Sequence, residues 1–175
     1  MPPLPPVCVR LSYRTRARDR IPQYHTAAMA KSERKAPQPP DPDAGMWQGR
    51  SVARRFVSPD GMIVLVGRTA EDNDVLTLKL ASPRDFWYHL AGDSGSHVVV
   101  RNPGNLDRPP RETERFAAAL AAGYSKAKNA GRVAVHVCRC EDVSKPRGFP
   151  PGKVLLDRFR SVQVSPSRGE GDQSA

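Results

Sequence analysis

Residues 85–101 read DFWYHLAGDSGSHVVVR and predict two β-strands joined by a loop of small residues. Phe86–Leu90 and His97–Arg101 are rich in the aromatic and β-branched residues that half-buried strands favour. Ala91–Ser96 contains two glycines and two serines, residue types that are typical of turns. The stretch therefore predicts two strands of a sheet around one exposed loop.

Upstream of this stretch, the sequence predicts further strands separated by turns. Arg54–Val57 predicts a short strand and Met62–Thr69 an apolar one, and Ser58-Pro59-Asp60-Gly61 between them fits a type I turn. Ala70–Asp74 reads as a polar turn. Val75–Ala81 alternates leucine with polar residues, which is typical of a strand with one buried face. These segments together favour a mainly antiparallel sheet.

Downstream, one segment has the periodicity of a helix. Arg111–Lys128 is Ala-rich, and its small residues, Ser125 among them, form a face that a neighbouring element can approach closely. Arg132–Cys138 predicts a strand, and Lys153–Val164 one long strand or a pair, after the loop Lys145–Gly152 (KPRGFPPG). Strands, one helix and more strands predict a single compact α+β domain, with the helix packed on one face of the sheet.

The two ends of the chain differ in composition from its middle. Residues 1–45 hold 9 of the 18 prolines and lack apolar periodicity, so we expect a disordered Pro/Arg-rich extension. A true start of translation at Met29 or Met46 is an alternative explanation for these residues. Ser167–Ala175 is polar and is expected to be a disordered tail. The predicted folded domain therefore spans residues 46–166.

The chain is strongly basic, with a formal net charge of +10 and a pI of about 10.1. Residues 46–166 carry 19 Lys and Arg against 12 Asp and Glu, so most of the excess (+7) lies in the predicted domain. A basic folded domain favours an anionic partner, usually nucleic acid, although a solvated charged surface is the alternative. The sequence shows no membrane span, secretory signal or disulfide framework, so we expect a cytoplasmic protein.

Several side chains that can carry chemistry lie around the loop of the quoted stretch. Asp85, Trp87 and His89 alternate and so share one face of a strand, and Ser96 and His97 follow the loop. This group is a candidate binding site, with ordinary core packing as the alternative and catalysis less favoured.

A second alternating group, His136, Cys138 and Cys140, resembles a metal site in its residue types but not in its spacing. Alternate residues on a strand lie about 6.6 to 6.8 Å apart, whereas two ligands of one zinc ion lie within ~4.6 Å of each other. No phosphate-binding glycine motif or nucleophile elbow is present in the sequence. We therefore expect no metal, no cofactor and no small-molecule substrate.

Cations gather around the downstream Pro/Gly loop. Lys145-Pro146-Arg147 and Lys153 flank it, and Arg68 lies at the end of a predicted strand. Cations on a rigid sheet and its loops suit contacts with phosphate, and an exposed aromatic ring nearby would stack on an unpaired base. Candidates for such a ring are Trp87, Tyr88 and Phe149.

Taken in order, these stretches resemble the motifs of the NFACT-R domain family. Arg54–Asp74 contains F-x-S-x-D-G and V-G-R-x-x-x-x-N-D, and Asp85–Arg101 contains D-x-W-x-H and G-S-H-V-V. The predicted helix contains A-A-x-x-A-x-x-S, and Lys145–Val154 contains K-P-x-G-x-x-P-G-x-V. Each motif is short, but their common order from Arg54 to Pro166 makes the resemblance specific.

The resemblance implies RNA binding. Multidomain members of the family act on stalled large ribosomal subunits and bind tRNA, so this chain looks like a standalone version of their RNA-binding module, without tail synthesis. Carried over by motif, with Arg147 added from the basic loop, the expected RNA-binding residues are Arg68, Asn73, Asp85, Trp87, His89, Ser96, His97, Lys145 and Arg147. The residues expected to hold the fold are Gly67, Asp74, Gly95 and Ser125.

The hypothesis at this point is a non-catalytic RNA-binding protein of translation or ribosome quality control. Its expected partners are tRNA or rRNA, and with them the large ribosomal subunit. A protein-interaction module and a DNA-binding module stay open as alternatives. A nuclease or RNA-modifying enzyme that uses His89, His97 and the aspartates is a less favoured one.

Overall fold

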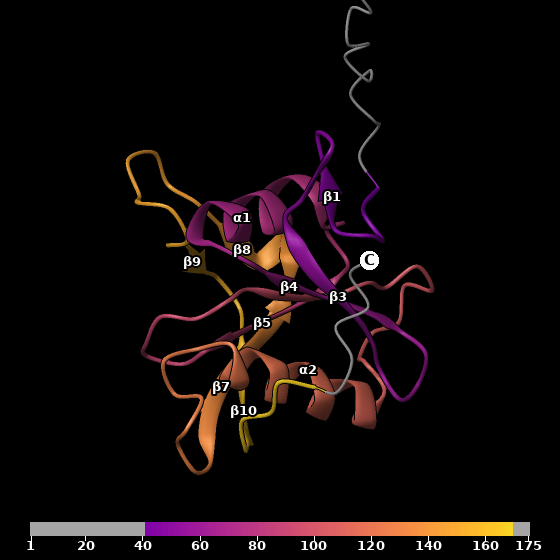
Figure 1. Cartoon of the computed structure of the whole chain (residues 1–175), viewed down its shortest axis with the longest axis vertical. Coiled ribbons are helices and arrows are strands. Elements are labelled where there is room, and N and C mark those ends of the chain that lie inside the picture. Colours follow the sequence, from indigo (N-terminus) through magenta and orange to yellow (C-terminus); the bar gives the residue numbers. More distant parts are fainter. Residues whose placement is uncertain (1–40, 170–175) are drawn as a thin grey trace, which may run out of the picture. The chain divides into compact units, whose positions relative to one another are not determined.

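The sheet consists of β3 (Ala53–Val57), β4 (Ile63–Gly67), β5 (Phe86–Leu90), β6 (Val98–Val100), β7 (Val133–Arg139) and β10 (Arg160–Val164). The computed structural model describes residues 41–169, and in it these six strands are ordered β10-β7-β5-β6-β4-β3 with antiparallel neighbours throughout. Helices cover both faces of the sheet (Figure 1). The predicted α+β class with a mainly antiparallel sheet is confirmed.

Shorter elements complete the described part of the chain. The helices are α1 (Ala70–Val75), which runs on into the π-helix η1 (Leu76–Leu80), and α2 (Arg111–Gly123). A 3-10 turn, η2 (Cys140–Asp142), follows β7. Two small ribbons pair β1 (Met46–Trp47) with β2 (Arg50–Ser51), and β8 (Val143–Ser144) with β9 (Leu155–Leu156).

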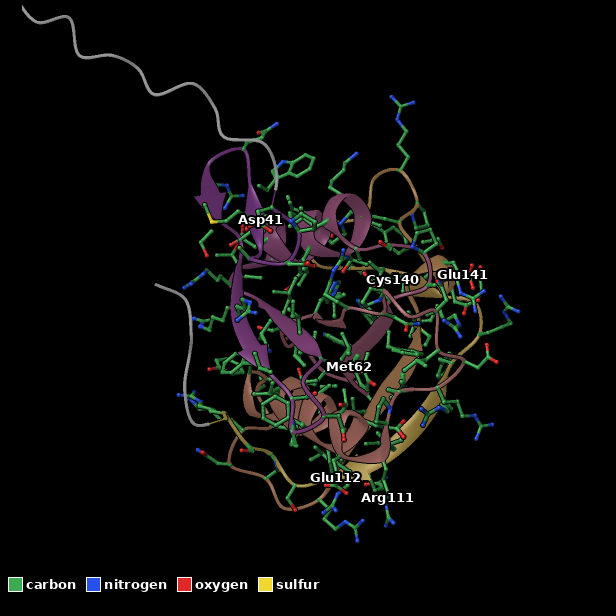
Figure 2. The ribbon with its side chains drawn as sticks, turned by 90° about the vertical axis from the view of Figure 1, so that its right-hand side faces the viewer. Asp41, Met62, Arg111, Glu112, Cys140 and Glu141 are labelled. Atoms are coloured by element: carbon green, nitrogen blue, oxygen red, sulfur yellow. The ribbon has the colours of Figure 1, made fainter. Side chains whose placement is uncertain are left out.

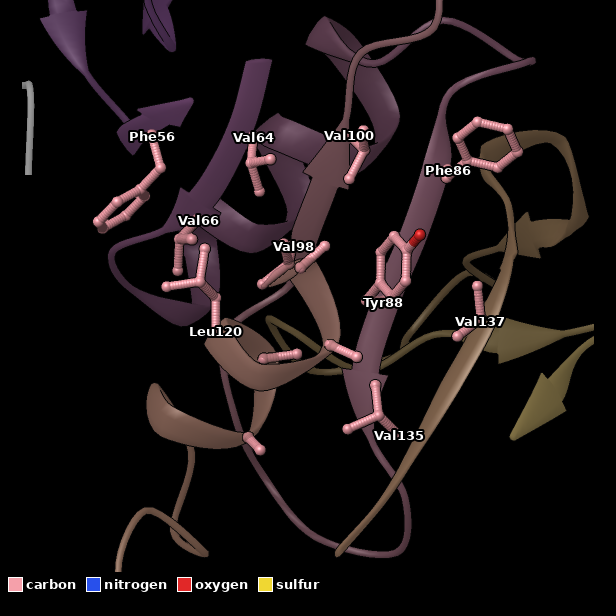
Figure 3. Packing of buried hydrophobic residues seen from close by; sticks show 14 residues of the cluster. Phe56, Val64, Val66, Phe86, Tyr88, Val98, Val100, Leu120, Val135 and Val137 are labelled. Carbon is pink, nitrogen blue, oxygen red and sulfur yellow. The ribbon is translucent and has the colours of Figure 1, made fainter. Parts of the chain in front are cut away.

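The main hydrophobic core lies between the sheet and α2 (Figure 3). Side chains alternate along a strand, so each strand sends every second residue toward the helix. In β5 these residues are Phe86 and Tyr88, and in β7 they are Val135 and Val137. The helix presents Leu120 and a set of buried alanines, whose small side chains allow close approach to the sheet: Ala117, Ala118, Ala121 and Ala122.

The predicted strand Val75–Ala81 is wrong, because Val75 ends α1 and Leu76–Leu80 form η1, which Ala81 caps. The predicted turn Ala70–Asp74 is likewise the first part of this helix. Thr69 begins it as the N-cap, its hydroxyl accepting a hydrogen bond from the Asp72 N–H at 3.1 Å. Leu76 and Leu80, four residues apart, are buried. Leucines at every second position thus fit a strand, whereas the helix buries the two leucines that lie four residues apart.

The predicted helix 111–128 ends five residues early, at Gly123. Residues beyond it bond to the loop after β5: the Ser96 N–H donates to the Tyr124 carbonyl at 3.0 Å, and the Lys126 N–H donates to that of Ser94 at 3.2 Å. The chain therefore leaves the helical path because these tertiary bonds replace helical ones. The start of α2 is also held from a distance, since the Thr113 N–H donates to Asp60 at 2.8 Å.

A second buried cluster lies on the other face of the sheet, beneath α1, η1 and β8. It contains Leu65, Leu76, Trp87 and Val99, with Cys138 near its edge. Figure 2 shows the chain leaving β7 on this side, at Cys140 and Glu141, whereas Arg111 and Glu112 at the start of α2 lie on the opposite side. We call this second surface the α1 face of the sheet.

The predictions for the chain ends fall mostly on residues 1–40 and 170–175, which lie outside the described residues. At the near end of the predicted tail, the Ser167 N–H donates to the Ala119 carbonyl at 3.0 Å. Within residues 41–169, no helix combines the length and the apolar character that crossing a membrane requires.

Candidate nucleic-acid interface

The loop between β8 and β9, residues 145–153, is an exposed basic segment on the α1 face. Two tight turns shape it, with the Phe149 N–H donating to the Pro146 carbonyl and the Lys153 N–H to that of Pro150, both at 3.2 Å. Gly148 and Gly152 occupy the left-handed region, with φ of 89° and 75°. Arg147 and Lys153 are exposed, and the Lys153 ammonium lies 5.3 Å from the centre of the Phe149 ring. The loop thus presents cations from a defined backbone.

Asp74, at the end of α1, clamps both ends of this loop. One carboxylate oxygen lies 2.7 Å from the Lys145 ammonium, and the other accepts the Gly152 N–H at 3.2 Å. The Lys145 ammonium also donates to the Pro150 carbonyl at 2.7 Å. The side chains of Asp74 and Lys145 are 21% and 19% exposed, so Lys145 is committed to holding the loop.

A buried chain of hydrogen bonds links the sheet to the same loop. The Trp87 indole N–H donates to the Thr77 hydroxyl at 3.2 Å, which lies 2.8 Å from His97 Nδ1. His97 Nε2 lies 3.2 Å from the Gly152 carbonyl. Because that carbonyl can only accept, Nε2 carries the proton, and Nδ1 accepts the proton of Thr77.

The environment of His97 keeps its imidazole neutral. The side chain is fully buried, and burial lowers the pKa of His97 to about 3, with the neighbouring His89 adding to the effect. A neutral ring fits its role as donor to one partner and acceptor from another. His97 and Trp87 therefore position the basic loop and have no exposed surface for RNA in this conformation.

Asn73 joins α1 to the loop after β5. Its amide oxygen accepts the His97 N–H at 2.9 Å, and its amide N–H donates to the Gly95 carbonyl at 3.2 Å. Gly67 must lack a side chain here, because a Cβ would lie 2.1 Å from the Asn73 amide oxygen. The Ser96 hydroxyl donates to the Gly67 carbonyl at 2.8 Å. Asn73 and Ser96 thus hold two backbone segments together.

Gly95 and Ser125 form a second close contact behind the same loop. A Cβ on Gly95 would lie 2.8 Å from that of Ser125, and the two residues form an isolated β-bridge. The Ser125 hydroxyl lies 2.6 Å from the Ala122 carbonyl, at the end of α2. Gly95 therefore allows the loop after β5 to reach the end of the helix.

Asp85 is separate from this group, since it precedes β5 and His89 lies near the strand's other end. Its carboxylate accepts the N–H groups of Ser82 and Asn102, both at 2.8 Å, and pairs with the Arg101 guanidinium. The side chain is buried and fully engaged within the protein. Asp85 therefore orders the chain around β5 and β6, and it does not converge with His89 and His97.

Two residues that were predicted to bind RNA, Arg68 and His89, have accessible side chains. Arg68 is exposed just before α1, with its Nε donating to the Ser51 hydroxyl at 3.2 Å. His89 is half-buried, stacked on Trp87 at 5.7 Å between ring centres, and burial lowers the pKa of His89. Sequence reasoning missed Thr77, which it had placed on a strand; the N-cap pattern Thr69-x-x-Asp72 was the signal for the helix that carries it.

Among residues 41–169, no three His, Cys, Asp or Glu side chains gather as metal ligands. Burial raises the pKa of the Cys138 thiol to about 12 and that of Cys140 well above its usual value.

Apart from Asp85, the residues predicted for the site divide into two sets. Those that support the loop 145–153 from within are Asn73, Trp87, His97, Asp74 and Lys145. Those with accessible surface near the loop are Arg68, His89, Ser96 and Arg147.

Comparison with known proteins places this chain among related sequences. It is 36% identical over 115 residues to the Rqc2 homolog RqcH of Bacillus subtilis (strain 168), which covers 66% of this chain and 20% of that protein. It is 37% identical over 119 residues to the Rqc2 homolog RqcH of Streptococcus suis (strain 05ZYH33), which covers 67% and 21%. The chain thus spans about a fifth of the length of the curated relatives it matches.

A more distant relative and a solved structure agree with these matches. The ribosome quality control complex subunit NEMF homolog of Drosophila melanogaster is 31% identical over 75 residues, covering 43% of this chain and 8% of that protein. The solved structure is the C-terminal part of the fibronectin/fibrinogen-binding protein from Streptococcus suis. It has a TM-score of 0.63 and 34% identity, and covers 67% of this chain and 47% of that one.

The family comparison matches the part of the chain that forms the sheet. The model described as "NFACT protein RNA binding domain" matches residues 53–158, which include β3 through β9 and the loop 145–153. The resemblance that the sequence motifs indicated is confirmed, and the chain belongs to the NFACT protein RNA binding domain family.

Proposed function

We propose that this chain is a non-catalytic RNA-binding protein of ribosome quality control, whose loop 145–153 contacts RNA phosphates. Two observations on its relatives support this proposal. The family is described as RNA-binding, which supports the activity. Relatives are named as Rqc2 homologs and as a ribosome quality control complex subunit, which supports the process. The RNA we propose is tRNA or rRNA, with the large ribosomal subunit as the wider partner. This function places the protein in the cytoplasm.

The observation that carries the proposal is the construction of the basic loop. Arg147 and Lys153 are exposed, while Asp74 and His97 fix the backbone beneath them. Cations that are already held in place lose less conformational freedom on binding than cations on a mobile segment. An arginine also offers a planar fork of donors that matches a phosphate group. A clamped, basic, exposed loop is therefore suited to a polyanion.

The contacts of His97, Asp74 and Asp85 favour binding over catalysis. Both ring nitrogens of His97 are hydrogen-bonded inside the protein, and the carboxylates of Asp74 and Asp85 are paired with Lys145 and Arg101. A general acid or base needs a free lone pair or proton within reach of a substrate. These groups are already occupied in holding the fold.

The proposal is tested by tRNA binding to the full chain over a range of salt concentrations. The double substitution Arg147→Glu/Lys153→Glu is expected to weaken binding strongly. If each cation contacts one phosphate, the negative slope of the logarithm of the association constant against the logarithm of the salt concentration becomes shallower by about 2. The matched control is Arg111→Glu/Arg115→Glu on α2, which makes the same change in net charge on the opposite side of the sheet.

Three outcomes separate the alternatives. Equal losses in both double variants would show that only net charge matters and that the loop is not the interface. Tighter binding of duplex or single-stranded DNA than of tRNA at the same salt would favour a DNA-binding module. Failure of the folded wild-type protein to bind any nucleic acid at low salt would favour a protein-interaction module; the name of the related Streptococcus suis protein makes fibronectin and fibrinogen the first partners to try.

A further inference from the structure

Part of the α1 face is left open, beyond the loop 145–153 and toward the β10 edge of the sheet. A row of side chains crosses β5, β7 and β10 there, because His89 lies opposite His136 and His136 lies opposite Ser161. Neighbouring strands are about 4.8 Å apart, so these side chains are in lateral contact range. Phe159, just before β10, places its ring 4.5 Å from the His136 ring at 63°.

Phe159 is 53% exposed, more than the other large apolar side chains of residues 41–169 that reach the surface. A single exposed apolar side chain is ordinary on a protein surface and does not make a site. This ring, however, is supported from the side by His136, whose Nδ1 lies 2.9 Å from the Ser161 hydroxyl. Phe159 is therefore an exposed aromatic ring beside a ring that is itself fixed.

The open row is linked to the basic loop through a buried residue. The Gly152 carbonyl contacts the fully buried His97, whose ring centre lies 5.3 Å from that of His89, and His89 is the cross-strand neighbour of His136. The cations of the loop and the exposed ring thus belong to the same face of the sheet, with His97 buried between them.

The cations of the loop 145–153 suit a polyanion. Arg158 pairs with Asp142 at 2.7 Å and Lys145 pairs with Asp74, so these two carboxylates are neutralised, whereas the exposed Asp157 and Glu141 beside Phe159 carry negative charge. Within residues 41–169, Arg147 and Lys153 have no carboxylate within 4.0 Å. An apolar protein partner has no need of these cations, whereas an unpaired nucleotide combines a flat ring with a phosphate and uses both features.

We propose that Phe159 and His136 form a platform on which an unpaired base of single-stranded RNA stacks, while its phosphates contact the loop 145–153. This inference rests on the proposed function and narrows it, because stacking requires bases that are free of pairing. A continuous duplex hides the faces of its bases and would use the loop alone.

The test compares two fluorescently labelled RNAs of about ten nucleotides, one single-stranded and one self-complementary duplex, binding to the full chain. Phe159→Ala is expected to weaken single-strand binding by about tenfold, to leave duplex binding unchanged and to leave the salt dependence unchanged. Phe159→Trp is expected to retain the affinity and to show quenching of its indole fluorescence when the single strand is added. His136→Ala removes the supporting ring and is expected to give a smaller loss than Phe159→Ala.

The matched control is Val57→Ala, an exposed apolar side chain on β3 at the opposite edge of the sheet, which is expected to bind like the wild type. If Phe159→Ala and Val57→Ala both bind the single strand like the wild type while Arg147→Glu/Lys153→Glu does not, the platform is wrong and the proposed function stands. If the wild type binds neither RNA, both fail together. An equal loss of duplex and single-strand binding in Phe159→Ala would also overturn stacking.

Discussion

The α2 face of the sheet is filled by Val, Ala and aromatic side chains, whereas the α1 face buries His97, Thr77 and Asn73 beside its apolar residues. Apolar packing is non-directional and tolerates many arrangements of similar volume. A buried hydrogen-bonded network has specific partners, so it fixes the position of what it touches.

The difference between the two faces matches what each one supports. The α2 face holds the sheet and the helix together through apolar packing. The α1 face ends at the loop 145–153, which is bound by Asp74 and His97. The comparison therefore predicts that substitutions on the α2 face change stability, and that substitutions in the α1 network change the loop as well.

The largest effect is expected from Leu120→Ala on the α2 face. Leu120 is fully buried, and its truncation leaves a cavity in the main core. The free energy of unfolding should fall by about 3 kcal/mol, measured by denaturant titration. The RNA affinity of the protein that stays folded should not change, because the loop lies on the other face. Leu120→Met is the control, with a loss below about 1.5 kcal/mol. A large loss of affinity in a folded Leu120→Ala protein would contradict the separation of the two faces.

The next effect is the pH dependence of stability that His97 produces. Its folded-state pKa of about 3 lies below the unfolded value of about 6.5. Between these values the unfolded chain binds a proton that the folded protein does not, so stability is full above pH 6.5 and falls as the pH decreases toward 3. Between pH 7 and pH 5, His97 should account for a loss of about 2 kcal/mol. His89, whose pKa is also lowered, adds to the loss in the same direction.

The measurement is urea unfolding of wild type and His97→Gln at several pH values from 7 to 5. Glutamine can still donate to the Gly152 carbonyl but does not titrate, so its stability profile should be flatter than that of the wild type. Parallel profiles in the two proteins would show that His97 does not control this dependence. The buried polar network of the α1 face would then make no measurable contribution to the pH dependence of stability.

Most strands could be predicted from the sequence because each has its own local pattern. Met62–Thr69 and Arg132–Cys138 predict strands from apolar or alternating residues, and β4 and β7 are found there. The π-helix η1 was missed because Leu76, Leu78 and Leu80 satisfy a period of two, and the pair Leu76 and Leu80 also satisfies a helix. Local patterns cannot decide between two periods that share the same residues.

The candidate site was harder to predict, because its contacts join residues that are far apart in the chain. Asp74 and Lys145 are separated by 71 positions, and His97 and Gly152 by 55. The types of residue suggested a site, but only the fold shows which cations are paired and which are accessible. Trp87 could be named from its motif, while its burial depends on η1 covering the sheet.

The smallest and most local effect is expected from Asp74→Asn, which tests the clamp itself. Asparagine can still accept the Gly152 N–H, but the Lys145 ammonium loses its counter-charge in a site that is about one-fifth exposed. The free energy of unfolding should fall by about 1 kcal/mol, and amide hydrogen exchange should accelerate in residues 145–153 while the α2 core is unaffected. Glu71→Gln is the matched control, because it removes the same charge from an exposed position on the same helix. If both variants exchange alike in the loop, Asp74 acts only through its charge, and the α1 face does not hold the loop in the way that its hydrogen bonds indicate.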